Sequence, residues 1–428
     1  MKNITDKNGL VLVTVLWVAI ILTVIVAAVA WSSRLDTKVC VAAVDSLELK
    51  WACRAGVETA DAVLNDDLRQ SDSLKDLWSE NDIDFNDIEL EGCTFDVRVF
   101  DEAAKLNVNT ATREQLLALP EMTEEIADAI IDWRDRNDTA SQAGEEGGYY
   151  KNLRYGYTIR NGRLRTIREL LLVKGVSENL FYGTGDVPAV KKDTAASINA
   201  VRYGMANMGW IEYLGCYSYD SDKDADGQAR ININDADENK LQNSLKIKKS
   251  HAKWIVENRS SKKYTSIADL INNNSPKAED KNSNADSDAA KPLDIETFSA
   301  IADKITVNTR RRVSGRVNVN TASKVVLAAL FGGGQDAEQI ADDIIAYRQS
   351  SPDGMQSVGQ LLQVSSVKVD SFKKVANYVT TRSDVYCIVS TGMSARAAMT
   401  PAILQSETVI DRSASPYNIL YCYHGADN

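Results

Sequence analysis

Hydrophobic and polar residues divide the chain into an apolar N-terminal stretch and a long region of mixed character. Residues 10–31 form a run of 22 residues without a charged side chain. A helix of that length rises about 1.5 Å per residue and just spans a hydrocarbon layer of about 30 Å. A cleavable secretory signal usually has an apolar core of only about 7–15 residues. The pattern therefore predicts a transmembrane helix.

Helical periodicity continues beyond the membrane segment. No proline interrupts the first 119 residues, and apolar side chains recur near one helical face at Val44, Leu47, Trp51 and Ala55. We therefore expect a single helix that leaves the bilayer, continues to about Asp67 and packs this apolar face on the rest of the protein. The alternative is a membrane helix joined to a separate soluble helix.

Alternating patterns that are typical of strands occur mainly near the two ends of the remaining chain. Residues 93–102 alternate in this way, with Phe95, Val97 and Val99 on one side. Three further strand patterns follow only much later, at residues 384–393, 397–412 and 417–425. The region between them is mostly helical in pattern.

These patterns predict an α+β fold, in which a long N-terminal transmembrane and amphipathic helix packs on a small antiparallel sheet. A large all-α insertion opens this sheet after its first strand, which is sterically easy when the ends of the insertion lie close together. The expected segments are a polar leader (1–9), a transmembrane helix (10–31), a helix and first strand (32–101), an inserted helical domain (102–382) and C-terminal strands (383–428).

The inserted region contains three related copies of one pattern. An apolar-Asn-apolar-Asn motif begins each copy, at residues 106–109, 231–234 and 317–320. A short helix, a hairpin and a second helix follow, and the second helix ends in an arginine at Arg134, Arg259 and Arg348. Each copy then reaches a serine or threonine before a leucine-rich helix, at Thr166, Ser266 and Ser357.

The second asparagine of each motif stands where a helix N-cap is expected, at Asn109, Asn234 and Asn320. An N-cap side chain accepts a hydrogen bond from a backbone amide at the start of the helix. We therefore expect these asparagines to maintain the fold without binding a ligand.

The repeats resemble the helix-hairpin-helix module, which grips DNA in many proteins. The hairpin of that family reads Leu-Pro-Gly-apolar-Gly, and its glycines let backbone amides approach a phosphate. Here Glu121 and Thr123 replace the glycines in the first copy, and Lys246 and Lys248 stand in the second. The resemblance therefore implies the fold of the module without its phosphate grip.

The charge balance argues against nucleic acid as a partner. The net charge is −11, whereas proteins that bind phosphate backbones usually carry a basic face. One loop of the first copy departs from this balance, because it combines tyrosines with six basic residues, Lys151, Arg154, Arg160, Arg163, Arg165 and Arg168. Such a composition is expected of a single-strand binding platform. The alternative is a solvated or partner-facing loop.

An aspartate-rich stretch before the second copy predicts a calcium site. Asp222, Asp224 and Asp226 with the following glycine fit the first half of an EF-hand loop, and Asp220 adds a further carboxylate. The glutamate expected at loop position twelve is Ile233, so the loop is incomplete. We expect calcium to stiffen the chain here, and the alternative is a solvated acidic turn.

Little in the chain predicts catalysis. Two histidines, His251 and His424, leave little room for histidine-based acid/base or zinc chemistry. A metal-dependent hydrolase built on the aspartates would lack a base or nucleophile. We therefore expect a protein that is not an enzyme.

The six cysteines show no Cys-x-x-Cys spacing. Cys40 and Cys53 lie thirteen residues apart on one expected helix, about 20 Å of rise, and therefore cannot bridge each other. The others can pair if this part of the protein is extracytoplasmic, in an arrangement that the sequence does not assign, and they are Cys93, Cys216, Cys387 and Cys422.

Taken in order, the whole chain resembles the minor pseudopilin K of type II secretion systems. The resemblance rests on a leader ending in Gly9, an uncharged helix from Leu10, a strand, an insertion opening with DEAAKLNVNTA, and terminal strands. It implies a pseudopilin fold, cleavage by prepilin peptidase after Gly9 and methylation of Leu10. It also implies calcium binding and a single pass through the bacterial inner membrane, with the N-terminus cytoplasmic and the bulk of the chain periplasmic.

The resemblance further implies a place at the tip of the pseudopilus, in a hetero-oligomer with other minor pseudopilins. Ordinary pilin-like subunits carry a glutamate that pairs with a neighbour's N-terminal amine at the position of Thr14, and the K subunits lack it. Because an unpaired carboxylate in hydrocarbon is costly, a subunit without a neighbour in front gains by omitting it. The alternative function is a membrane-anchored DNA-binding receptor built on the helix-hairpin-helix repeats.

Overall fold

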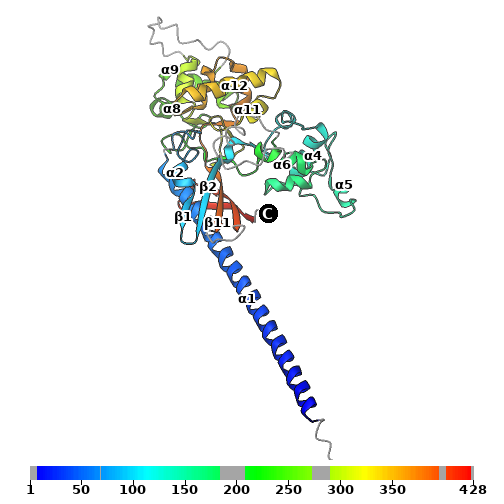
Figure 1. The fold of residues 1–428 in the computed structure, drawn as a ribbon. Coiled ribbons are helices and arrows are strands. Elements are labelled where there is room, and N and C mark those ends of the chain that lie inside the picture. The colour runs from blue at the N-terminus through cyan, green and yellow to red at the C-terminus, as the bar shows by residue number, and fades with distance from the viewer. Residues whose placement is uncertain (1–6, 68, 184–207, 272–289, 395–401, 426–428) are drawn as a thin grey trace, which may run out of the picture.

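The computed structural model describes residues 7–67, 69–183, 208–271, 290–394 and 402–425. Figure 1 shows a long helical rod with a small sheet at its far end, and a helical region that lies beyond and beside this sheet. Residues 1–6 of the expected leader lie outside the described residues.

The rod is the single helix α1 (Lys7–Asp66), which runs for 60 residues. It is long and apolar enough to cross a membrane, and its apolar part is exposed throughout. Only the last third of α1 has buried side chains, which include Leu49, Ala52, Val57 and Leu64. The prediction of one continuous helix is therefore confirmed.

The buried face of α1 differs from the predicted one. Val44, Leu47 and Trp51 are exposed by 44%, 58% and 66%, and another set of apolar residues meets the sheet. The helix carries apolar side chains on more than one face, so periodicity alone selects the wrong face. The exposed face is free to contact something outside this chain.

The sheet has five antiparallel strands in the order β1-β2-β11-β12-β13. This agrees with the predicted α+β fold and its small antiparallel sheet. The short first strand has no clear sequence pattern, and the other four lie close to their predicted positions. The strands are β1 (Ile88–Leu90), β2 (Cys93–Asp101), β11 (Val385–Ser394), β12 (Ile403–Asp411) and β13 (Asn418–Gly425).

One face of the sheet packs on α1 around Phe95, Val97, Ile388 and Ile410. The short helix α2 (Asp82–Phe85) and the fully buried Trp78 extend this core. Side chains of the insertion cover part of the opposite face, where Tyr217 and Tyr219 meet Val385, Cys387 and Val409.

The insertion leaves and re-enters the sheet on adjacent strands. Asp101 ends β2 and pairs with Tyr386 near the start of β11. A short 3-10 helix, η1 (Glu102–Ala104), follows β2 directly. Because the two ends are neighbours in the sheet, a large domain fits between them without disturbing strand pairing.

Each repeat closes on itself through a parallel pair of two-residue strands. In the first repeat, Leu106 pairs with Leu214, and in the third, Val317 pairs with Val379. An antiparallel pair also joins the approach to the second repeat with that to the third. These strands are β3 (Leu106–Asn107), β4 (Leu214–Gly215), β5 (Tyr219–Asp220), β6 (Ile231–Asn232), β7 (Ile305–Thr306), β8 (Val313–Ser314), β9 (Val317–Asn318) and β10 (Val379–Thr380).

Short helices fill the space between each pair of strands. The first repeat contains α3 (Arg113–Leu117), α4 (Glu124–Arg134), α5 (Gly147–Lys151), η2 (Ile167–Leu172), α6 (Glu178–Tyr182) and η3 (Trp210–Glu212). The second contains α8 (Glu238–Leu245), α9 (Lys249–Ser261), η4 (Ile267–Leu270) and α10 (Ile295–Ile301). The third contains α11 (Lys324–Leu330), α12 (Gln335–Ser350), η5 (Val358–Gln363) and α13 (Val369–Val375).

The third repeat donates hydrogen bonds to the second at two places. The Ser357 hydroxyl donates to the Ser299 carbonyl at 3.2 Å, and Asn377 in turn donates to Thr265. Phe298 and Phe372 meet with ring centroids 5.8 Å apart. The three repeats share one hydrophobic core, which makes the insertion a single body.

Candidate functional site

The second asparagine of each repeat joins two backbone segments and does not cap a helix. Asn109 donates to the Leu164 carbonyl at 3.1 Å and accepts from the Leu164 amide at 2.7 Å. Asn234 bonds Tyr264 in the same two-way manner. The N-cap prediction is therefore wrong. An asparagine amide offers one donor and one acceptor side by side, so it can imitate a pairing strand.

Residues C-terminal to these asparagines cap the helices instead. Thr112, Asp237 and Ser323 are the N-caps of α3, α8 and α11, and each side chain accepts a backbone amide from the first turn. The third repeat keeps the same two-way pair as the others, between Asn320 and Met355. The asparagines thus do maintain the fold, through another contact.

The arginine that ends the second helix binds its own repeat. Arg348 is buried and donates to the carbonyls of Val319 and Ala322 at 2.9 and 2.8 Å. Arg134 contacts the equivalent carbonyls in the first repeat, and Arg259 contacts one of them in the second. A guanidinium engaged in this way holds the turn after the asparagine motif, and it does not face solvent as a phosphate ligand would.

The first asparagine of the third repeat docks the insertion onto the sheet. Asn318 is fully buried, and its amide nitrogen lies 3.1 Å from the Asp72 carbonyl, from the Asp101 carboxylate and from the Ser383 hydroxyl. The equivalent Asn232 donates only to Asn308, close to its own repeat. The same motif position therefore serves a longer-range contact in the third repeat.

Buried charges surround this junction. Arg412, which follows β12, is paired with Asp72 and lies 3.6 Å from Asp67. Burial, and then the charges of Asp72 and Asp76, raise the pKa of Asp67 to about 7. Burial also raises the pKa of Asp101 to about 6, against hydrogen bonds that favour its charged form. The end of α1, the sheet and the insertion thus meet at one densely charged place.

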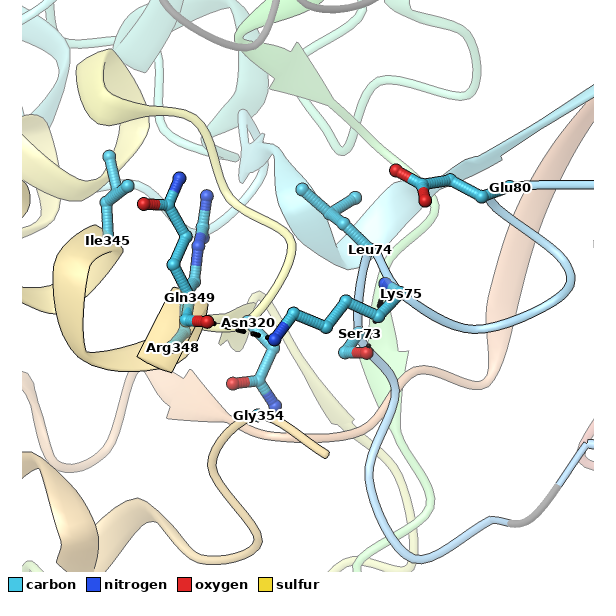
Figure 2. A pocket seen from close by; sticks show the side chains of 9 residues that line it. All are labelled: Ser73, Leu74, Lys75, Glu80, Asn320, Ile345, Arg348, Gln349 and Gly354. Atoms are coloured by element: carbon cyan, nitrogen blue, oxygen red, sulfur yellow. Dashed lines mark hydrogen bonds between the residues drawn. The ribbon is translucent and has the colours of Figure 1, made fainter. Parts of the chain in front are cut away.

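Lys75 provides a second link between the segment after α1 and the third repeat. Its Nζ atom donates to the carbonyl of Gln349 at 3.0 Å, at the C-terminal end of α12 (Figure 2). It also donates to the carbonyl of Ser351 at 2.7 Å. A positive charge is favourable at this end of a helix. A pocket of about 160 Å³ lies beside the contact. It is smaller than the roughly 300 Å³ of an ordinary ligand site.

Two of the four predicted calcium ligands, Asp220 and Asp222, form ion pairs with arginines. The Asp220 carboxylate accepts from Arg316 at 2.8 Å and from Arg230 at 3.1 Å, and Asp222 accepts from Arg230 at 3.3 Å. Burial opposes the charge of Asp220, but the charges of Arg316 and Arg230 hold the pKa of this carboxyl below its usual range.

The other two predicted ligands lie apart from that cluster. Asp224 accepts the amides of Asp226 and Gln228 at 3.1 and 2.7 Å, whereas the Asp226 side chain is 72% exposed. The four carboxylates therefore form no common oxygen cage in this arrangement, and the calcium site stays a prediction. Within the described ranges, the carboxylates that bring three oxygens within 4.8 Å of one another are Asp67, Asp72 and Asp76.

The basic residues of the tyrosine-rich loop do not form one surface of free charges. Arg160 pairs with Glu169 at 2.5 Å, and Arg168 pairs with Glu407 of the sheet at 3.0 Å. Arg168 also lies over the Tyr423 ring at 5.1 Å. The remaining four are exposed, namely Lys151, Arg154, Arg163 and Arg165.

The tyrosines of this loop build its core. Tyr150 is fully buried and meets Trp133 with ring centroids 5.2 Å apart, and Tyr157 packs against both rings. Tyr155 is 80% exposed. A platform for successive bases needs several exposed rings, and the geometry does not supply them.

The remaining candidate residues lie on α1 and in the sheet. The helix begins at Lys7, so Gly9 and Leu10 fall within its first turn. The Thr14 hydroxyl donates to the Val11 carbonyl at 2.9 Å, within the same helix. All six cysteines are free thiols, so none of the considered disulfides is formed.

Two protein-family models match this sequence, and both are described as "Type II secretion system (T2SS), protein K". The first covers residues 94–182, from β2 through most of the first repeat, and the second covers residues 317–382, the third repeat. No curated protein matches the chain.

One solved structure is similar in outline and is described as "The Crystal Structure of the GspK-GspI-GspJ complex from enterotoxigenic Escherichia coli Type 2 Secretion System". A chain in it is 13% identical with a TM-score of 0.49, and the match covers 89% of this chain and 97% of that chain. At this score the likeness alone establishes neither family nor function. The two family models agree with each other and lie on the sheet-to-insertion joint and on the docked third repeat. Two separate parts of the chain, the sheet-to-insertion joint and the third repeat, therefore match protein K of the type II secretion system.

Proposed function

We propose that this protein is a minor pseudopilin that caps the tip of the type II secretion pseudopilus, nucleates its assembly and thereby supports protein export across the outer membrane. It is a structural subunit and not an enzyme. It is anchored in the inner membrane by α1, with its N-terminus cytoplasmic and its head periplasmic. Cleavage after Gly9 and methylation of Leu10 belong to the same proposal.

The observation that carries the proposal is the position of the insertion. In Figure 1 the repeats lie at the end of the molecule opposite the N-terminus of α1, beyond and beside the sheet. A pseudopilus grows by stacking subunits whose N-terminal helices run along its axis. A subunit placed above this one would have to occupy the space that the insertion fills.

The exposed face of α1 supports other minor pseudopilins as partners. Leu47 and Trp51 project from the rod where it begins to pack on the sheet, on a side that the sheet leaves uncovered, and both are more than half exposed. Burying apolar surface stabilises association by about 25 cal/mol per Å². Helices of neighbouring subunits, which share this amphipathic character, are suitable partners for such a stripe.

A variant that lacks the insertion tests the capping role. Residues 105–382 are replaced by a short Gly-Ser linker, which is sterically possible because Asp101 and Tyr386 are paired neighbours. We expect the intact protein to be found once, at the fibre tip, and the shortened protein to be incorporated along the fibre. Circular dichroism of the purified variant checks that its sheet is intact. Detection of the intact protein at every level of the fibre would refute the proposal.

A further inference from the structure

The hairpin between α8 and α9 carries a charge opposite to that of the protein as a whole. The chain has 60 acidic and 49 basic residues. Between residues 239 and 256, however, five lysines occur without a single acid, namely Lys240, Lys246, Lys248, Lys249 and Lys253. Lys246 and Lys248 form the turn itself and are exposed. We call the surface around these two residues the basic hairpin.

The corresponding hairpin of the first repeat has the same backbone and the opposite charge. Glu121 and Lys246 both adopt a left-handed conformation, with φ of 58° and 54°. Side chains other than glycine rarely occupy this region, because Cβ crowds the backbone there. The first hairpin continues with Glu124 and Glu125, whereas the equivalent residues of the second are Lys249 and Ser250. The fold therefore fixes the turn but not the sign of its charge.

A charged residue held in an unfavourable backbone conformation suggests a role for its side chain. Glycine would relieve the crowding at position 246, and the related DNA-binding modules use it there. Lysine instead keeps a cation at this exposed position of the turn. The strain and the local excess of lysine are independent observations that favour the same interpretation.

The groups around the basic hairpin strengthen its positive potential. Helix α9 has no acidic residue in its first turn and no side-chain cap at Lys248, so the positive end of its dipole adds to the lysines. The backbone amide of Lys291 donates to the Ser250 carbonyl at 3.1 Å, which brings another lysine to this end of α9. The nearest acid along α9 is Glu257, which lies 3.8 Å from Lys253.

The surface is also placed where a partner can reach it. Figure 1 shows α8 and α9 at the end of the head that is most distant from the start of α1. A contact there would not compete with subunits that pack along the rod.

We propose that the basic hairpin is a docking surface for an acidic patch of another protein. It extends the proposed tip role by naming a partner surface. Protein is favoured over nucleic acid because Lys246 and Lys248 occupy the two positions where glycines would let backbone amides reach a phosphate. The net charge of −11 also repels a long polyanion, whereas a compact acidic patch contacts only the lysines.

The test measures binding of a short labelled oligoglutamate peptide, which stands in for a compact acidic patch, to the full chain in detergent, by fluorescence anisotropy at two salt concentrations. The double variant Lys246→Glu/Lys248→Glu is expected to bind about tenfold more weakly or worse. The matched control is Lys262→Glu/Lys263→Glu, which makes the same charge change just beyond the opposite end of α9. It is expected to retain most of the affinity. Equal losses in both variants would overturn the proposal, because they would show a response to net charge alone.

Two further measurements complete the test. Lys246→Gly removes the charge and relieves the left-handed backbone, so it should raise the melting temperature while weakening binding; unchanged binding contradicts the proposal. Duplex and single-stranded DNA of similar charge serve as the competing probe. Tighter binding of DNA than of the oligoglutamate peptide would overturn the proposal in favour of a nucleic-acid surface. The measurements do not involve fibre assembly, so their failure leaves the capping role untouched.

Discussion

Replacing Asn318 by alanine should loosen the joint between the insertion and the sheet. Asn318 lies at the start of the third repeat and contacts the segment after α1, the end of β2 and the start of β11 at once. Asn232 provides a matched control, because it holds the same motif position in the second repeat. Its amide group accepts from Asn234 at 2.9 Å and donates to Asn308 at 3.1 Å.

The expected magnitudes follow from these contacts. A neutral hydrogen bond contributes about 1 kcal/mol net, and one to a charged group contributes about 1.5–3 kcal/mol. Alanine at position 318 removes a donor from the buried Asp101 carboxylate, a donor from the Asp72 carbonyl and the acceptor for the Asn320 amide. We therefore expect a loss of about 4 kcal/mol for Asn318→Ala and about 1–2 kcal/mol for the half-buried Asn232→Ala.

Hydrogen exchange followed by mass spectrometry measures this difference at the level of peptides. A gap of about 2–3 kcal/mol corresponds to roughly 30- to 150-fold faster exchange. The acceleration should appear in β11 and at the end of β2 for Asn318→Ala, and only within the second repeat for Asn232→Ala. Similar acceleration of β11 in both variants, or an effect of Asn318→Ala that stays within the third repeat, would refute the reasoning.

Three other outcomes are expected. Because the pKa of Asp67 is raised to about 7, the folded protein holds a proton that the unfolded chain releases near pH 4, so this carboxyl lowers stability as the pH rises from about 4 to about 7. Asp67→Asn should raise the melting temperature at pH 8 and flatten its dependence between about pH 5 and 7, measured by scanning fluorimetry. Lys75→Met removes two donated hydrogen bonds at the end of α12 and should cost about 1–3 kcal/mol, seen as faster proteolysis there. Leu47→Glu and Trp51→Glu should reduce co-purification with other minor pseudopilins without changing the melting temperature of the isolated chain, since both side chains are exposed.

The elements with regular periodicity could be predicted from the sequence. Strand β2 alternates between buried and more exposed positions along most of its length, as the pattern of residues 93–102 predicts. The length of α1 also follows from its uninterrupted helical pattern. The face of α1 that packs on the sheet could not be predicted from the sequence. Leu49 and Trp51 are both apolar, and only the position of the sheet determines which of them is buried.

The contacts of the junction could not be predicted, because they join residues that are distant in the sequence. Asp72 and Arg412 are separated by 340 positions, and neither stands in a recognisable motif. The aspartates of the predicted calcium loop illustrate the same limit. Local spacing suggested a metal cage, whereas Arg316 approaches Asp220 from 96 residues away and supplies the positive charge instead. Arg230 and Arg316 each stand directly before an asparagine motif, and this position was the available signal for their pairing with Asp220.

The two-residue strands help to explain how the large insertion stays rigidly attached to a small sheet. Such strands are too short to show alternation, yet each parallel pair brings the end of a repeat back to its beginning. The whole insertion returns in the same way, from Asp101 to Tyr386. Asn318 and the Arg168–Glu407 pair then fix its orientation from two sides. A cap that excludes further subunits must resist being pushed aside, so the buried polar joint is as necessary to the proposed role as the bulk of the repeats.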